Sequence, residues 1–306
     1  MAETRECDVV IVGGGPAGLT AAIYLARFHL RTIVIDDGHS RAEWIPRTRN
    51  HAGYPGGVPG PALVAAMREQ AVEYGTSIVV DRVADIGRDG DHFVASASTA
   101  TVRARALLLA TGVVNNRPVM DDALHDAALK AGALRYCPIC DGYEVTDTAV
   151  GVIGTGDRGT KEALFLRGYT ADLTLVAADG PHDLTPEHRR KLAAAGVVLV
   201  DGPARDFTLD DGRLSFETAS GRQSFASVYP ALGSAVHSEL AEALGANTEN
   251  VGCIIVDTHQ RTSVPGLYAA GDVVLGLDQI SHAMGEGGVA ATTIRNDLAE
   301  VAPLYR

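Results

Sequence analysis

The sequence is short of basic residues and of long apolar runs, and both shortages narrow the possible functions. Lys and Arg number 26 against 38 Asp and Glu, which gives a formal net charge of −12 at pH 7. An acidic protein repels nucleic-acid phosphates and anionic lipid headgroups, so we expect neither nucleic acid nor a membrane as partner. No apolar run could span a bilayer. The polar start, Met1 to Asp8, does not resemble a signal peptide, and we expect a cytoplasmic protein.

Cysteine is scarce as well, and the spacing of the four Cys residues is more informative than their number. The four Cys include one close pair, Cys137-Pro-Ile-Cys140, whereas a small secreted disulfide scaffold needs several. A structural zinc site would require four ligands, and the chain has no second Cys-x-x-Cys, so we predict no metal. An inert disulfide is disfavoured in the cytosol. Reversible redox chemistry is therefore the favoured role of the pair, and Cys7 and Cys253 are expected in core packing.

Glycine, by contrast, is abundant, and its first cluster has the pattern of a dinucleotide-binding turn. The apolar strand 9–12 leads into Gly13-Gly-Gly15-Pro-Ala-Gly18, then a helix over 19–28, then a strand over 32–35 that closes at Asp36. Gly13 permits the turn, Gly15 lets the backbone approach a pyrophosphate, and Gly18 lets the helix pack closely on the strand. The helix start offers N–H groups to phosphates, and Asp36 would accept hydrogen bonds from a ribose.

The same order of features occurs a second time. A strand over 149–153 leads into Gly154-Thr-Gly156-Asp157-Arg-Gly159, a helix follows, and after the strand 173–176 comes Asp179, 20 residues beyond Gly159. Two such units suit a chain of 306 residues, which is long enough for two domains. Two dinucleotide sites are needed when two cofactors must meet, and FAD with a nicotinamide is the usual pair. A duplicated domain that has lost its ligand remains the alternative.

Two further markers lie near the ends of these units. An apolar strand over 105–110 ends in Ala110-Thr111-Gly112, and the segment 267–272 ends in Gly271-Asp272. A strand that ends in Gly-Asp places a carboxylate at the sheet edge where open parallel sheets bind ligands. The long helix expected over 279–298 would direct its N-terminal dipole toward an anionic group.

Together these motifs, in this order and spacing, resemble the low-molecular-weight thioredoxin reductases over essentially the whole chain. The resemblance implies an α/β fold with two Rossmann-like, three-layer domains. A nicotinamide-type domain over 116–239, which carries the Cys pair, would be inserted into an FAD domain formed by 1–115 and 240–306. It also implies a homodimer. The family's FAD contacts map onto Gly13, Gly15, Pro16, Ala17, Gly18, Asp36, Arg41, Asn50, Val83, Ala110, Thr111, Gly112, Gly271, Asp272, Gln279 and Ile280.

The resemblance further implies a role for each residue of the redox segment. Cys140 would face the flavin, Cys137 would attack the substrate disulfide, and Asp141 would move the proton during thiol exchange. The substrate would be a thioredoxin-like protein or a small disulfide or dithiol. A dithiol oxidase that passes electrons to oxygen, a reductase supplied by ferredoxin or another donor, and a flavin-bearing redox sensor without turnover remain as alternatives.

The sequence departs from the family at the nicotinamide site. Members that use NADPH carry a His-Arg-Arg cluster after the second strand of that domain, whereas this chain has Ala177-Ala178-Asp179. The predicted nucleotide contacts there are Gly154, Gly156, Asp157, Gly159 and Asp179, and Asp179 favours NADH over NADPH because it would repel a 2′-phosphate. The later His188-Arg-Arg follows a helix start at Thr185-Pro186 and is expected on a solvated helical face.

Trp44 is the only Trp and lies in a segment that is glycine-rich in the family's NADPH-using members. Two interpretations remain open: the ring stacks on the flavin or covers its entrance, or it packs against the FAD domain.

Overall fold

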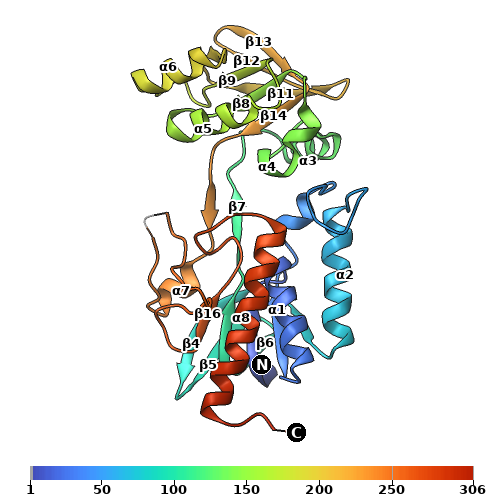
Figure 1. Cartoon of the computed structure of the whole chain (residues 1–306), viewed down its shortest axis with the longest axis vertical. Helices are drawn as coiled ribbons and strands as arrows, with labels where there is room; N and C mark the ends of the chain where they lie inside the picture. The colour runs from blue at the N-terminus through green and yellow to red at the C-terminus, as the bar shows by residue number, and fades with distance from the viewer. Residues whose placement is uncertain (1–2, 250, 306) are drawn as a thin grey trace.

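The computed structural model describes residues 3–249 and 251–305 as two lobes stacked along the long axis of the molecule (Figure 1). The lobe that holds both chain ends is built on a seven-stranded sheet in the order β3-β2-β1-β6-β5-β4, with β16 paired to the second half of β6. Strands β1, β2, β3, β6 and β16 are mutually parallel, while β4 and β5 form an antiparallel ribbon beside β6. The strands are β1 (Glu3–Val12), β2 (Thr32–Asp36), β3 (Ser77–Val80), β4 (Val83–Asp89), β5 (His92–Ala97), β6 (Ala100–Leu109) and β16 (Leu267–Ala269).

The central strands of this sheet are covered on both faces. Because side chains alternate along a strand, Val9 and Ile11 of β1 point to one face, where they pack with the helices α1 (Pro16–Arg27), α2 (Gly60–Glu73) and α8 (Ile280–Val301). Val10 and Val12 point to the other face and pack with the β4–β5 ribbon and the short helix α7 (Glu239–Ala243). Helix α1 lies directly against α8, so residues near the start and the end of the chain share one core.

The second lobe has three layers. Its centre is a parallel sheet in the order β10-β9-β8-β14. The helices α5 and α6 pack on one face, and the antiparallel sheet β11-β12-β13 packs on the other through Phe207, Phe216 and Phe225. The elements are β8 (Val150–Ile153), α5 (Gly156–Leu166), β9 (Leu173–Val176), α6 (Pro186–Ala194), β10 (Val198–Val200), β11 (Arg205–Asp210), β12 (Arg213–Thr218), β13 (Gly221–Phe225) and β14 (Ser227–Pro230).

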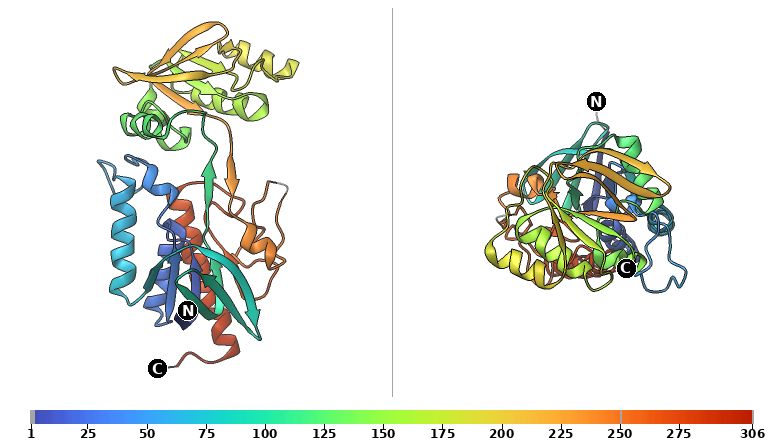
Figure 2. Two further views of the ribbon diagram at one scale, coloured as in Figure 1. Left: turned by 180° about the vertical axis from the view of Figure 1, so that it is seen from behind. Right: turned by 90° about the horizontal axis from the view of Figure 1, so that it is seen from above.

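Two antiparallel strands connect the lobes. β7 (Val113–Asn115) leads into the second lobe and β15 (Ser234–Val236) leads back, with Ala235 opposite Val114; both views show them side by side between the lobes (Figures 1 and 2). The segment entering the second lobe contains α3 (Asp122–Ala131), α4 (Pro138–Asp141) and the 3-10 turn η2 (Gly142–Val145), which lie on the side that faces the first lobe. The 3-10 turn η1 (Arg41–Trp44) belongs to the first lobe. The expected α/β fold with an inserted Rossmann-like unit is confirmed.

Most predicted elements occur where the sequence places them, and the helix starts differ most. Helices α1 and α5 begin inside their glycine motifs, at Pro16 and Gly156. Pro is favourable in the first turn of α1, and residue 156 needs to be glycine because its φ is 61°. Helix α6 begins after Thr185 as predicted, and the Thr185 hydroxyl accepts the His188 N–H at 3.2 Å. Cys7 is buried as expected, whereas the prediction for Cys253 is wrong because its side chain is half-exposed. Within 3–249 and 251–305, no helix is long and apolar enough to cross a membrane.

Candidate functional site

A cavity lies at the carboxyl ends of β1, β6 and β16, on the side of the first lobe that faces the second. The strand ends, the first glycine turn, η1, the start of α8 and the Cys137–Cys140 segment all contribute to its wall. The predicted residues that line it are Gly13, Gly15, Pro16, Ala17, Asp36, Arg41, Asn50, Ala110, Thr111, Gly112, Cys137, Cys140, Asp141, Gly271, Asp272, Gln279 and Ile280. The described lining residues do not include Gly18 or Val83, which lie in the packed interior around α1 and β4.

The first glycine turn closes tightly on the protein side and stays open on the cavity side. Gly13 has a φ of 105°, and a side chain on it would overlap the Ala110 carbonyl. A Cβ on Gly18 would overlap the carbonyl of Gly13, so Gly18 sets the contact between α1 and β1. At Gly15, by contrast, an added Cβ would meet only the Ser40 hydroxyl among the described residues, at 3.2 Å. The turn therefore leaves room for a bound group at Gly15, next to the N-terminus of α1.

Asp36 ends β2 at the edge of this cavity and is already held by the protein. Its Oδ1 accepts the Gly14 N–H at 2.9 Å, and its Oδ2 pairs with Arg68 of α2. The side chain is almost completely buried. Sequence reasoning identified Asp36 but missed Arg68, because no motif marks a residue on α2. This carboxylate therefore fixes the shape of the turn as well as facing the cavity.

On the opposite wall, the start of α8 and the end of β16 carry an acidic cluster bridged by one cation. Arg41 Nη1 lies 2.8 Å from Asp272 Oδ2 and 3.0 Å from Asp278 Oδ2. Burial and the neighbouring Asp278 raise the pKa of Asp272, and Arg41 opposes this effect. Gly271, with a φ of 84°, donates its N–H to Glu286 Oε2 at 2.7 Å. The Gly-Asp corner predicted at residues 271–272 is thus anchored from α8.

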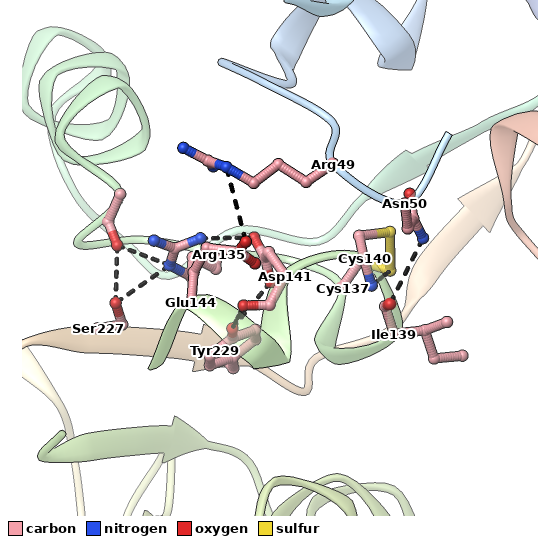
Figure 3. Close-up of polar contacts among 11 residues, drawn as sticks. Arg49, Asn50, Arg135, Cys137, Ile139, Cys140, Asp141, Glu144, Ser227 and Tyr229 are labelled. Atoms are coloured by element: carbon pink, nitrogen blue, oxygen red, sulfur yellow. Dashed lines mark hydrogen bonds and ion pairs between the residues drawn. A yellow bond between two sulfur atoms is a disulfide. The ribbon is translucent and has the colours of Figure 1, made fainter. Parts of the chain in front are cut away.

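Cys137 and Cys140 form a disulfide that faces the same cavity as the first glycine turn. The amide Nε2 of Gln279 lies 3.2 Å from Cys137 Sγ and 3.3 Å from Cys140 Sγ. Asn50 donates to Gln279 Oε1 at 2.9 Å. It also donates to the Ile139 carbonyl at 3.4 Å (Figure 3). The resemblance gives Gln279 and Asn50 as FAD contacts, and in the structure both also connect the first lobe to the redox segment.

Asp141 follows the disulfide and has two partners from the second lobe (Figure 3). Arg135 Nη1 lies 3.0 Å from its Oδ2, and the Tyr229 hydroxyl donates to its Oδ1 at 2.8 Å. Burial raises the pKa of Asp141 above the usual range of a carboxyl, although both partners act in the opposite direction. Sequence reasoning missed both. Arg135 lies in no motif, and Tyr229 is distant in the chain and reaches Asp141 only through the pairing of β14 with β8.

Trp44 lines the cavity and contacts two residues of the segment that enters the second lobe. The Arg117 guanidinium lies 4.4 Å from the centroid of its ring, and the His125 ring meets it edge-on at 6.1 Å. The Nε2 of His125 lies 2.9 Å from the Tyr136 hydroxyl. One of the two interpretations was that the ring packs against the FAD domain. Arg117 and His125 instead belong to residues 116–239, the predicted inserted domain. A place on the flavin side stays a prediction, since the ring also borders the cavity.

The second glycine turn is arranged differently from the first. The N–H of Gly156 donates to the Asp183 carbonyl at 2.9 Å, and the Thr155 hydroxyl donates to the same oxygen at 3.2 Å. His182 holds this segment through Nε2 to the Leu175 carbonyl at 3.1 Å and Nδ1 to the Thr155 hydroxyl at 3.3 Å. Part of the loop between β9 and α6 therefore occupies the place beside the start of α5 where a phosphate would lie.

The remaining residues predicted for this second site have structural contacts or are exposed. A Cβ on Gly159 would lie 2.9 Å from the Gly154 backbone, and one on Gly154 would lie 3.0 Å from the Ala231 Cβ, so both glycines serve close packing. Asp157 pairs with Lys161 at 2.7 Å on the surface of α5. Asp179 is exposed on the loop after β9.

Comparisons with known proteins give concordant matches along the chain. The family model described as pyridine nucleotide-disulphide oxidoreductase matches residues 7–287. A thioredoxin reductase of Peptoclostridium acidaminophilum is 31% identical, over 93% of this chain and 95% of its own length. Among solved structures, HlmI superposes with a TM-score of 0.88 at 28% identity, covering 98% of this chain and 95% of that one. The thioredoxin reductase of Streptococcus pyogenes MGAS5005 gives 0.87 at 26% identity, with coverages of 97% and 99%.

Proposed function

This chain belongs to the pyridine nucleotide-disulphide oxidoreductase family, and from that membership we propose that it moves electrons between FAD and the Cys137–Cys140 disulfide and on to a protein or small-molecule disulfide. It is an FAD-dependent oxidoreductase of the thioredoxin reductase type. The observation that carries the proposal is that the disulfide and the first glycine turn line one cavity, with Gln279 in contact with both sulfurs.

The residues around the cavity fit FAD. The open face of Gly15 and the start of α1 suit a pyrophosphate, and the carboxyl edge of a parallel sheet is where this fold takes its ligand. We assign FAD binding to residues 1–115 and 240–306, through the predicted contacts that line the cavity, and the inserted domain to 116–239. FAD held by these residues would supply or accept two electrons.

The exchange with substrate uses the thiols of the reduced pair. The Cys137 thiolate attacks one sulfur of the substrate disulfide, whose S–S bond breaks, and the leaving thiolate takes a proton. The Cys140 thiolate then attacks Cys137 Sγ, which releases the second substrate thiolate and restores the Cys137–Cys140 bond. Gln279 Nε2 would donate to the thiolates as they form. Asp141, whose pKa is raised by burial, would supply and recover the proton.

A direct test uses the purified protein with FAD, kept free of oxygen. We expect dithiothreitol to bleach the visible flavin band of the wild type and to leave the band of Cys140→Ser almost unchanged, since the variant cannot form the disulfide that connects thiol to flavin. FAD content, measured after denaturation, controls for loss of the cofactor. A variant that bleaches as fast as the wild type would contradict the assignment of the relay to Cys140.

A second candidate function is supported by the covered start of α5. A nicotinamide could reach the turn of residues 154–159 only if Asp183 moved away from Gly156. The same relay without a nicotinamide would be that of a dithiol oxidase, with electrons passing from a dithiol to oxygen, or of a reductase supplied by ferredoxin or another donor. NADH, favoured over NADPH by the exposed Asp179, remains the donor if the loop opens.

The NADH-dependent reductase and the dithiol oxidase separate in one comparison of donors. If flavin is bleached without oxygen by NADH, the nicotinamide site works and the reductase is supported. If only dithiothreitol bleaches it, and peroxide accumulates in air, the dithiol oxidase is supported. A thioredoxin-like protein and a small disulfide are the proposed partners, and a homodimer is the proposed assembly, which sedimentation would check.

A further inference from the structure

A groove between the two lobes adjoins the redox cavity. One wall is the segment after η1, with Ile45, Pro46, Arg47 and Arg49, and the other is the end of α3 together with the segment up to Asp141. The second wall comprises Leu129, Lys130, Ala131, Gly132, Leu134, Arg135 and Asp141. Arg49 is drawn above Asp141 and Glu144, and Cys137 and Cys140 lie further along the same segment (Figure 3).

The groove is basic in a protein that is acidic as a whole. Arg47, Arg49, Lys130 and Arg135 line it against a single acid, Asp141, while the formal net charge of the chain is −12. The two lobes contribute two cations each. A local reversal of sign against the overall charge concentrates anions at that place.

Two of the four cations keep an uncompensated charge. Arg135 is paired with Asp141, and Arg49 lies 3.7 Å from Glu144. Arg47 donates to the carbonyls of Gly56 and Gly57 at 3.2 and 3.0 Å, which orient the guanidinium without neutralising it. Lys130 is exposed, and among residues 3–249 and 251–305 no carboxylate is paired with it.

The groove and the cavity that contains the disulfide share part of their lining. Six residues line both hollows: Ile45, Pro46, Leu129, Leu134, Arg135 and Asp141. Four of these, Ile45, Pro46, Leu129 and Leu134, are apolar and are called the throat below. The other two form the ion pair of Arg135 with Asp141. Lys130 therefore lies on the groove side of these shared residues and Cys137 on the cavity side.

We infer that this groove is the entrance and anion subsite for a small disulfide or dithiol that carries a carboxylate. The apolar throat accommodates the carbon chain that bears the sulfurs, and Arg47 and Lys130 hold the carboxylate at the mouth. The walls come from both lobes, so a slender molecule can enter this arrangement of the lobes, whereas a folded protein would require them to separate. The inference rests on the proposed function, because it names the class of substrate for the same cysteine pair.

The test uses two dithiols that differ in one charge. Dihydrolipoate carries a carboxylate, and dihydrolipoamide has the same carbon chain and thiols but is neutral. Anaerobic bleaching of the flavin in the wild-type holoenzyme, followed against dithiol concentration at low ionic strength, gives a half-saturating concentration for each. We expect about tenfold tighter half-saturation for dihydrolipoate, on the order of threefold for each of the two cations. The preference should shrink as salt is raised.

A matched pair of variants tests whether the preference for dihydrolipoate over dihydrolipoamide depends on the groove. Lys130→Gln should reduce the preference about threefold, the worth of one exposed ion pair, with little change for dihydrolipoamide. Lys191→Gln removes the same charge from an exposed position on α6, where Lys191 pairs with Glu187, and should keep the full preference. Calorimetric binding of oxidised lipoate and lipoamide to the same proteins gives the comparison without turnover.

The outcomes distinguish a failure of the proposed function from a failure of the anion subsite. If neither dithiol bleaches the flavin, the proposed function itself fails. If both bleach it with equal half-saturation, the cysteine relay stands and the anion subsite is wrong. The subsite is also wrong if Lys191→Gln lowers the preference as much as Lys130→Gln does, since the effect would then come from the overall charge.

Discussion

The two glycine turns of this protein have the same sequence pattern and different surroundings. In the first, an added Cβ at Gly15 would meet only Ser40 among the described residues, and the turn opens on a cavity. In the second, the corresponding Gly156 donates its N–H to the Asp183 carbonyl, so a loop of the same lobe already uses this donor at the start of α5, although an added Cβ would come no closer than 3.8 Å to that oxygen. The first and last glycines of both turns are required for close contact between helix and strand. A glycine pattern therefore establishes the fold of the turn, while a bound ligand depends on what lies over it.

The helices that follow the two turns also differ, at one corresponding position. If Gly13 is matched with Gly154, Ala21 in α1 corresponds to Glu162 in α5. Ala21 is fully buried in the apolar core. Glu162 Oε1 is shielded from solvent and has no hydrogen-bond partner in the part of the chain that the structure describes, and burial raises the pKa of Glu162 to about 7. The second unit thus carries a carboxyl where the first has a methyl group.

The largest effect is expected from an alanine at the first residue of each turn. Gly13→Ala should lower the free energy of unfolding by about 3 kcal/mol or more, because Gly13 has a positive φ and a Cβ would overlap the Ala110 carbonyl. Gly154→Ala should cost about 1–2 kcal/mol, since its Cβ would press on the Ala231 methyl at 3.0 Å. Urea unfolding followed by circular dichroism measures both variants. Equal losses of unfolding free energy in the two would contradict the predicted difference between the turns.

A somewhat smaller effect concerns Glu162 and pH. Its folded pKa, about 7, lies above its usual value of 4.5. The stability that Glu162 contributes is therefore complete below pH 4.5 and is lost as the pH rises through 7. Glu162→Gln does not titrate, so the variant should be more stable than the wild type at pH 8 by about 2 kcal/mol.

Thermal or urea unfolding at several pH values measures this difference. Glu187→Gln removes an exposed carboxylate from α6, and that variant should keep the pH dependence of the wild type. An unchanged slope between pH 5 and 8 in Glu162→Gln would show that Glu162 is not the titrating group.

The third comparison tests which turn holds FAD. Gly15→Ala places a methyl group on the open side of the first turn, where the backbone would meet the pyrophosphate, and should weaken FAD binding about tenfold. Gly156→Ala should leave FAD affinity unchanged, although its φ of 61° makes alanine unfavourable there. Fluorescence titration of FAD into the apoprotein reads affinity directly. Equal weakening in both variants would point to a general loss of folding.

The smallest effect tests the loop over the second turn. His182→Ala removes the bonds to the Leu175 carbonyl and the Thr155 hydroxyl, which hold Asp183 over Gly156. Losing about 1 kcal/mol of local stability should speed hydrogen exchange at the Gly156 amide about fivefold, with no change at the Gly13 amide. If the Gly156 amide kept the rate of the wild type, His182 would not be what holds the loop.

Much of the fold was accessible to sequence reasoning because its signals are local. The turns at Gly13 and Gly154, the strands 32–36 and 173–176, and the Thr185 cap each depend on residues within about one helical turn of one another. The Cys137–Cys140 pair was recognisable for the same reason, since two intervening residues bring the sulfurs within reach. Cys253 was misplaced because its neighbourhood depends on how a loop returns to the first lobe.

The surroundings of the redox pair were not accessible in this way. Gln279 contacts both sulfurs and Tyr229 contacts Asp141, yet each is far from its partner along the chain. Such contacts depend on the arrangement of lobes and strands, and a side chain that will make one looks like any other polar residue in the sequence. The same holds for Arg68 beside Asp36 and for the basic groove between the lobes.

By itself the sequence determined two Rossmann-like units and a close cysteine pair just before the second glycine turn, and the family resemblance added that one unit is inserted into the other. Tertiary structure alone decided that the pair faces the first turn, that the second turn is covered by its own loop, and that four cations gather in a groove of an acidic protein. The physical reason is the separation along the chain over which each property is determined. Backbone geometry depends on neighbours in the sequence, whereas the exposure, local charge and accessibility of a site depend on residues that are distant in the sequence and close in the fold.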